Sequence, residues 1–131
     1  MPAIEVTEGG LRAAYLVSNS KSGTEHAVIY FDGVLQHTFG YPNDEALGGH
    51  PLYKFGLNFY AINLVHNSPV LDNLGSLNAK TFPGSEKHFL SFNHWIVSFH
   101  DETLEVIGRS IEFIGTCEVD DSKEALRRYG T

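Results

Sequence analysis

The fold is decided by the stretch Trp95-Ile-Val-Ser-Phe-His100-Asp101-Glu102-Thr103-Leu-Glu-Val-Ile-Gly108, in which two β-prone runs flank an acidic dipeptide. This pattern predicts an antiparallel hairpin, in which alternate residues share one face. With a two-residue loop, His100 lies opposite Thr103. A longer loop is the alternative, because Asp-Glu is not a preferred pair for a tight hairpin turn. The predicted apolar face consists of Trp95, Val97, Phe99, Leu104 and Val106.

The opposite face of this hairpin carries the chemistry-bearing side chains, which are His94, Ser98, His100, Glu105 and Arg109, with Ile96 and Ile107 between them. Neighbours on one face of paired strands lie ~5–7 Å apart, so a histidine, a carboxylate and a hydroxyl here are within reach of general acid–base chemistry. We expect Glu105 to orient His100 and raise its pKa, with His94 and Ser98 as the other candidate catalytic residues. The alternative is a solvated outer face, on which polar residues alternate with buried ones.

Four residues are candidates for binding a ligand. Arg109 suits an anionic group, because its guanidinium donates hydrogen bonds in a fork. Trp95 and Asp101 belong to the same hairpin. His37 follows Asp32-Gly33, a dipeptide typical of tight turns, so residues 28–31 and 34–37 are predicted to pair as a second hairpin. This pairing places His37 on an apolar face, as a core histidine or as a ligand.

The remaining elements come from local signals along the chain. Residues 11–17 form the expected first strand, residues 40–56 a long connection, and residues 57–66 another strand. Ser68 and Pro69 are a good N-cap and first residue for a helix over 68–79, and a short helix is expected over 121–129.

The expected fold class is therefore α+β, mostly β. An antiparallel sheet of about six strands, curled or closed into a small barrel, is covered by the first helix. The expected core contains Tyr30, Phe39, Phe59, Val97 and Phe99. The length of 131 residues suits one domain over residues 1–131.

Composition excludes several classes of protein. The chain has 9 Lys and Arg against 16 Asp and Glu, a formal net charge of −7, so a nucleic-acid partner is not expected. The single Cys rules out a disulfide framework and fits a cytoplasmic location. The N-terminus has no basic and apolar signal segment, and the longest apolar stretch is too short to span a membrane.

Seven histidines raise the question of a metal site. His88, His94 and His100 would lie ~20 Å apart in successive pairs along one strand, too far for chelation. A site would have to combine one of these three with His37, His66 or His26 from other strands. We expect no metal and no cofactor. Ser98, His100 and Glu105 have the residue types of a catalytic triad, but the chain lacks the Gly-x-Ser-x-Gly elbow.

The string Phe99-His-Asp-Glu-Thr-Leu-Glu-Val-Ile107 resembles a Phe-His-Asp-x-Thr-x-Glu-x-Ile pattern of small bacterial proteins without an assigned function. The resemblance covers only residues 88–108. It implies a bacterial origin and brings no activity, ligand or fold with it.

Two functions of different class follow from these observations. The first is a binding or accessory protein, with an aromatic-lined pocket for a small molecule and a homodimer as a further option. The second is a small cofactor-independent hydrolase, isomerase or lyase that uses His100 and Glu105 for acid–base chemistry. The two differ in whether the face from His94 to Arg109 lines a pocket or faces solvent.

Overall fold

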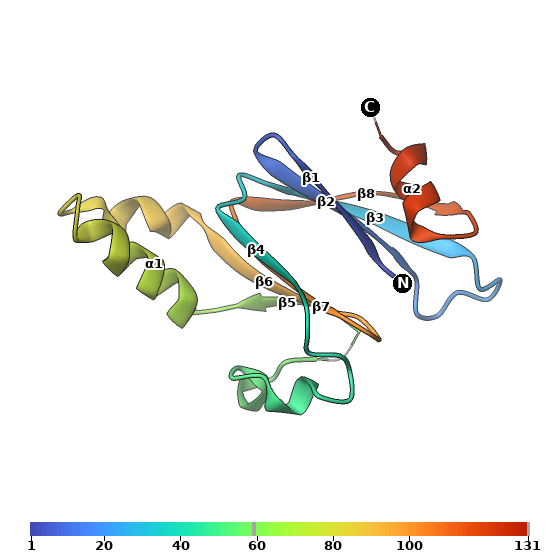
Figure 1. Ribbon diagram of the computed structural model, residues 1–131, viewed down its shortest axis with the longest axis horizontal. Helices are drawn as coiled ribbons and strands as arrows, with labels where there is room; N and C mark the ends of the chain where they lie inside the picture. Colours follow the sequence, from blue (N-terminus) through green and yellow to red (C-terminus); the bar gives the residue numbers. More distant parts are fainter. Residues whose placement is uncertain (59, 131) are drawn as a thin grey trace.

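The computed structural model describes residues 1–58 and 60–130, which form eight strands, two α-helices and three short 3-10 helices (Figure 1). The strands are β1 (Ala3–Thr7), β2 (Gly10–Leu16), β3 (Glu25–Asp32), β4 (Gln36–Gly40), β5 (Ile62–Val65), β6 (Asn93–Ser98), β7 (Thr103–Gly108) and β8 (Ser110–Glu118). The helices are α1 (Pro69–Ala79) and α2 (Ser122–Arg128), with 3-10 helices η1 (Leu47–Gly49), η2 (Tyr53–Phe55) and η3 (Ser85–Ser91). The expected α+β class, rich in strands, is confirmed.

The strands form two four-stranded antiparallel sheets rather than one curled sheet or barrel. Their orders are β1-β2-β3-β8 and β4-β7-β6-β5. The main core lies between them and contains Leu11, Ala13, Ile29 and Phe31 from the first sheet and Trp95, Val97, Phe99, Leu104 and Val106 from the β6–β7 hairpin of the second sheet. Two facing apolar surfaces explain why the sheets stack instead of closing into a barrel.

Both predicted helices are confirmed to within a residue or two. Ser68 caps α1 by accepting a hydrogen bond from the backbone N–H of Leu71. Asp121 caps α2 in the same way through Glu124. In Figure 1, α1 lies at one end of the molecule and α2 at the other, over the first sheet. None of the described helices is long and apolar enough to cross a membrane.

The prediction of a hairpin around Asp32-Gly33 is wrong. β3 pairs with β2 and β8, whereas β4 pairs with β7, so the turn carries the chain from one sheet to the other. Gly33 has a positive φ of 63°, and the Arg109 backbone N–H donates to the Asp32 carbonyl at 2.8 Å. A turn residue permits a tight reversal but does not specify which strands it joins.

The hairpin of β6 and β7 exists, but its loop has four residues instead of two. Val97 lies opposite Leu104 and Ile96 opposite Glu105, a shift of two positions from the expected register. An even shift leaves every side chain on its expected face. The apolar face is therefore confirmed: all five of its residues belong to the core between the sheets.

Other differences concern the expected strand over residues 57–66, the ends of the chain and the expected core. That strand is shorter than expected, because β5 comprises only Ile62–Val65. The expected first strand is present as β2, but β1 and β8 were not anticipated, which brings the strand number to eight. Of the expected core, Val97 and Phe99 are buried, and Phe39 packs against them. Tyr30 instead lies half-buried beside Gly10 on the other face of its sheet. Phe59 lies outside the described residues.

Candidate functional site

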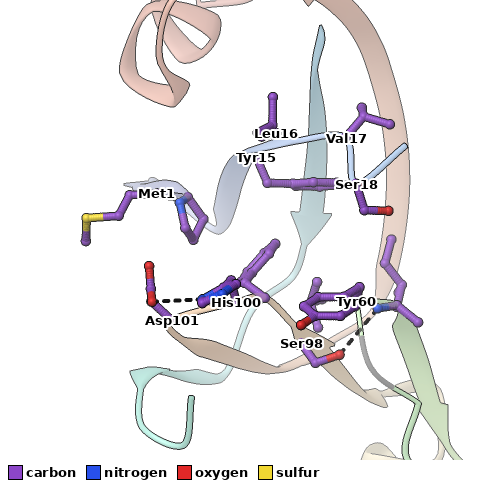
Figure 2. Close-up of a pocket in the computed structure, with 14 residues that line it drawn as sticks. Met1, Tyr15, Leu16, Val17, Ser18, Tyr60, Ser98, His100 and Asp101 are labelled. Atoms are coloured by element: carbon purple, nitrogen blue, oxygen red, sulfur yellow. Dashed lines mark hydrogen bonds and ion pairs between the residues drawn. The ribbon is translucent and has the colours of Figure 1, made fainter. Parts of the chain in front are cut away.

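A cavity of about 700 Å³ opens between the two sheets at one end of the sandwich. Its walls come from the end of β2, the start of β5 and the end of β6. Figure 2 shows Tyr15, Leu16 and Val17 on one side of this space and Tyr60 and Ser98 on the other. The described lining is mostly apolar: Met1, Pro2, Tyr15, Leu16, Val17, Ala61, Ile62, Val97 and Phe99, with Ser18, Tyr60, Ser98, His100 and Asp101 as its polar members.

Aromatic rings form much of the inner wall. Tyr15 and Phe99 pack with their ring centroids 5.4 Å apart at a tilt of 48°. Burial raises the pKa of the Tyr15 phenol, so this hydroxyl stays protonated at neutral pH. Volume and lining are both those of a small-molecule pocket, for which 300–1,000 Å³ is the usual range.

A hydrogen-bonded group of polar side chains stands at the mouth of the cavity. The Tyr60 hydroxyl donates to Asp44 Oδ2 at 2.6 Å. His100 Nδ1 lies 3.0 Å from Asp101 Oδ1, and His100 Nε2 lies 3.8 Å from Asp44 Oδ2. The His100 side chain is 76% exposed, so solvent and solutes reach it.

These contacts shift the pKa values at the mouth in opposite directions. The hydrogen bond to Asp101, followed by the charge of Asp44, raises the pKa of the His100 imidazole. The hydrogen bond from Tyr60 lowers the pKa of the Asp44 carboxyl, and the same bond raises the pKa of the Tyr60 phenol. The imidazole of His100 is therefore easier to protonate than a free histidine.

Ser98 shapes the cavity wall through its hydroxyl. This side chain is 2% exposed and donates to the Asn58 carbonyl at 2.8 Å. The same oxygen accepts a hydrogen bond from the Ala61 N–H at 3.3 Å. Ser98 was expected among the catalytic residues; its contacts are those of a residue that positions the wall.

Glu105 lies on the outer face of the second sheet, at the centre of a separate buried network. Its Oε1 is 2.9 Å from His94 Nε2 and its Oε2 is 2.9 Å from His50 Nε2. The side chains of His94 and His50 are 1% and 7% exposed. Ser68 Oγ completes the chain at 2.7 Å from His94 Nδ1. This face is therefore covered rather than solvated.

The hydrogen bonds assign the protons of this network. The Leu52 backbone N–H donates to His50 Nδ1 at 3.0 Å, so the proton of a neutral His50 sits on Nε2 and is donated to Glu105. Because the Glu105 carboxylate accepts from Nε2 of His94, a neutral His94 carries its proton on Nε2, and its Nδ1 accepts from the Ser68 hydroxyl. Burial raises the pKa of the Glu105 carboxyl, but the hydrogen bonds from His94 and His50 outweigh burial and lower it overall.

The network holds the connection between β4 and β5 in place, and its hydroxyl is not accessible for nucleophilic catalysis. His50 belongs to the long connection between β4 and β5, so Glu105 fastens that connection to the sheet. Ser68 is 3% exposed and serves as the N-cap of α1, so it has no access to a substrate. Beside the network lies a small pocket of about 220 Å³ lined by Gln36, Thr38, Val70, His94, Glu105 and Ile107.

The structure thus separates the predicted site residues. Glu105 and His94, which were expected to share one face, are hydrogen-bonded to each other. His100, which Glu105 was expected to orient, has Asp101 and Asp44 as its partners. Trp95 is 5% exposed in the core, where its ring centroid lies 5.4 Å from that of Phe31. The separation follows from the four-residue loop, which takes His100 off the strand.

Two further candidates lie away from the cavity. Arg109 follows Gly108, which pairs with Asn93 at the opposite end of the β6–β7 ladder from Ser98, and its guanidinium stacks 5.1 Å from the Phe92 ring centroid. His37 is half-buried on β4, opposite Val106 on the core-facing side, as expected. Its proposed role in ligand binding stays a prediction.

Several residues of the two sites were not anticipated. Tyr15 lines the inner wall of the cavity, Asp44 and Tyr60 stand at its mouth, and His50 contacts Glu105. The N-cap signal did identify Ser68, although not its bond to His94. No local pattern marks His50, because a loop histidine 55 residues from its partner in sequence becomes visible only after folding.

Across residues 1–58 and 60–130, no group of three or more His, Cys, Asp or Glu side chains is placed to hold a metal ion. Comparisons with protein-family models, with curated proteins and with solved structures returned no match.

Proposed function

We propose that this protein binds a small, largely apolar molecule in the cavity between the open ends of its two sheets. The observation that carries the proposal is the cavity itself, about 700 Å³ in volume and walled by Tyr15, Tyr60 and Phe99 together with aliphatic side chains. Pockets of this size bury most of the surface of a drug-sized molecule. The few polar groups gather at the mouth, so the apolar part of a ligand lies inside and its polar part outside.

Burial of apolar surface supplies the affinity in such a site. A ligand with one or two rings would displace water from the faces of Tyr15 and Phe99, and each ring contact adds about 0.5–1.5 kcal/mol beyond the area it buries. The polar side chains at the mouth would orient the ligand rather than hold it.

Filling the cavity tests this proposal. We expect Ala61→Trp to weaken the binding of an uncharged apolar dye, N-phenylnaphthylamine, by about tenfold, because the indole occupies the space and overpacking opposes a second ring there. Fluorescence titration of the dye measures the affinity. Asn73→Trp, on the exposed surface of α1, is the matched control and should bind like the unmodified chain.

Equal affinity of the two variants and the unmodified chain would contradict the proposal. Circular dichroism melting curves for each variant establish that Ala61→Trp is folded. If that variant unfolds, Val17→Trp places the same ring in the opposite wall of the cavity and serves in its place.

A second candidate function is acid–base catalysis by His100, with Asp101 in place of the Glu105 first expected. The observation that favours it is the 3.0 Å contact of His100 Nδ1 with Asp101 at the mouth of the cavity, where the imidazole is both exposed and oriented. The Asp101 hydrogen bond raises the pKa of His100, and histidine is the side chain most often used for proton transfer at physiological pH.

Hydrolysis of p-nitrophenyl butyrate tests this second function. If His100 acts as general base, His100→Gln should slow hydrolysis by about 100-fold, whereas His66→Gln, at an exposed histidine, should leave the rate unchanged. Equal rates for both variants and the unmodified chain would exclude hydrolysis by His100 and leave the binding function standing.

A further inference from the structure

We propose that the ligand of this cavity is an organic amine, with an aromatic or aliphatic body inside the cavity and a protonated amino group at its mouth. The inference rests on the proposed binding function and adds the chemical class of the ligand. It follows from two independent features of the cavity: its apolar, aromatic walls and the sign of the charge at its opening.

The charge at the mouth is negative. Asp101 lines the cavity, Asp44 accepts a hydrogen bond from Tyr60 in the wall, and Glu45 lies close enough to raise the pKa of His100. Against these three carboxylates stand the His100 imidazole and the α-amino group of Met1. The described residues that line the cavity include no Lys or Arg. A carboxylate ligand would therefore meet net repulsion, and an ammonium group net attraction.

The aromatic walls of the cavity also favour a protonated amine as the ligand. The faces of aromatic rings carry partial negative charge, so they attract a cation within about 6 Å of the ring centroid. Tyr60 stands beside Asp44 at the mouth, and Tyr15 and Phe99 lie further inside. A protonated amine at the mouth would thus meet carboxylates and a ring together, while its body displaces water from the inner rings.

The protonation of His100 modulates this preference. The groups that face His100 are Asp101 on its own loop and Asp44 and Glu45 on the connection after β4. When pH rises through the pKa of His100, the imidazole loses its proton and the mouth becomes more negative. An amine that stays protonated should bind more tightly as pH rises, whereas a carboxylate should bind less tightly.

Three probes that share one ring system test the inference: tryptamine, tryptophol and indoleacetate, which differ in bearing a cationic, a neutral or an anionic group. At low salt we expect tryptamine to bind about fivefold more tightly than tryptophol, and tryptophol more tightly than indoleacetate. The advantage of tryptamine should grow from about pH 5.5 to about pH 8.5 and shrink at high salt. Isothermal titration calorimetry measures all three affinities.

Asp101→Asn should remove most of the preference for tryptamine while leaving the affinity for tryptophol unchanged. Glu112→Gln removes an exposed carboxylate on β8 and is the control for net charge; it should keep the preference. Equal affinities for tryptamine and tryptophol, or a preference for indoleacetate, would overturn the inference while the binding function stands. Failure of all three probes, together with unaltered dye binding by Ala61→Trp, would overturn the binding function itself.

Discussion

Replacing Glu105 with alanine is expected to lower the free energy of unfolding by about 3 kcal/mol. The variant leaves two buried imidazole N–H groups, those of His94 and His50, without their acceptor. His50 cannot turn its proton to the other nitrogen, because that nitrogen accepts the N–H of Leu52. Each buried donor without an acceptor costs about 1–3 kcal/mol. Urea unfolding followed by circular dichroism measures the change.

Two comparisons separate this effect from a general loss of charge. Glu105→Gln keeps one acceptor oxygen but turns an amide NH₂ toward the second imidazole, so its cost should lie between those of the alanine variant and the unmodified chain. Glu112→Gln, at an exposed position, should change stability by less than about 0.5 kcal/mol. A cost below that same value for Glu105→Ala would show that the network does not contribute to stability.

The pH dependence of the same variants has a defined sign. Because the pKa of Glu105 is lower in the folded chain than its ordinary value, its stabilising contribution is fully present at every pH above that ordinary value. The contribution is lost as pH falls through the lower pKa of the folded state. The stability advantage of the unmodified chain over Glu105→Gln should therefore shrink in acid and stay constant near neutrality.

Replacing Trp95 with alanine is expected to have the largest effect on stability, about 4 kcal/mol. Trp95 is 5% exposed on β6, and its ring packs against Phe31 of the first sheet at a centroid distance of 5.4 Å. Truncation removes this contact between the sheets and leaves a cavity that rigid strands on both sides cannot close. Guanidinium unfolding followed by circular dichroism measures the loss, since the variant has no tryptophan fluorescence.

The control for Trp95 is an aromatic residue that folding leaves exposed. Phe82 is 62% exposed after α1, and Phe82→Ala should cost less than about 0.5 kcal/mol. Trp95→Phe, which keeps a ring opposite Phe31, should cost clearly less than the alanine variant. Equal costs for Trp95→Ala and Phe82→Ala would contradict the assignment of Trp95 to the core between the sheets.

The sequence predicted helices and strand faces well where the pattern that specifies them lies within a few neighbouring residues. The helix from Pro69 to Ala79 was expected because Ser68 and Pro69 satisfy the needs of a helix N-terminus without reference to the rest of the chain. The apolar face of the β6–β7 hairpin was expected because the alternation of side chains depends only on strand geometry. This prediction held despite the wrong loop length, because a shift of two residues preserves the faces.

The candidate site was predicted only in part. His100 and Asp101 were named and lie at the cavity mouth, and Glu105 and His94 were named and are hydrogen-bonded. Their division between two sites depends on the four-residue loop after Ser98, which turns His100 away from the face of Glu105. The expected hairpin at Asp32-Gly33 failed for a related reason: a turn fixes the direction of the chain locally, whereas strand pairing depends on which apolar faces meet.

The sequence by itself therefore determined the secondary structure class, both helices and the face of each side chain in the decisive hairpin, because these follow from propensity and periodicity over a few residues. Only the tertiary structure decided the pairing of β3 with β8, the cavity between Tyr15 and Tyr60 and the contact of His50 with Glu105. Each of these joins segments more than forty residues apart. The two sheets come together because burying their apolar faces outweighs the entropy of closing the long loops between their strands.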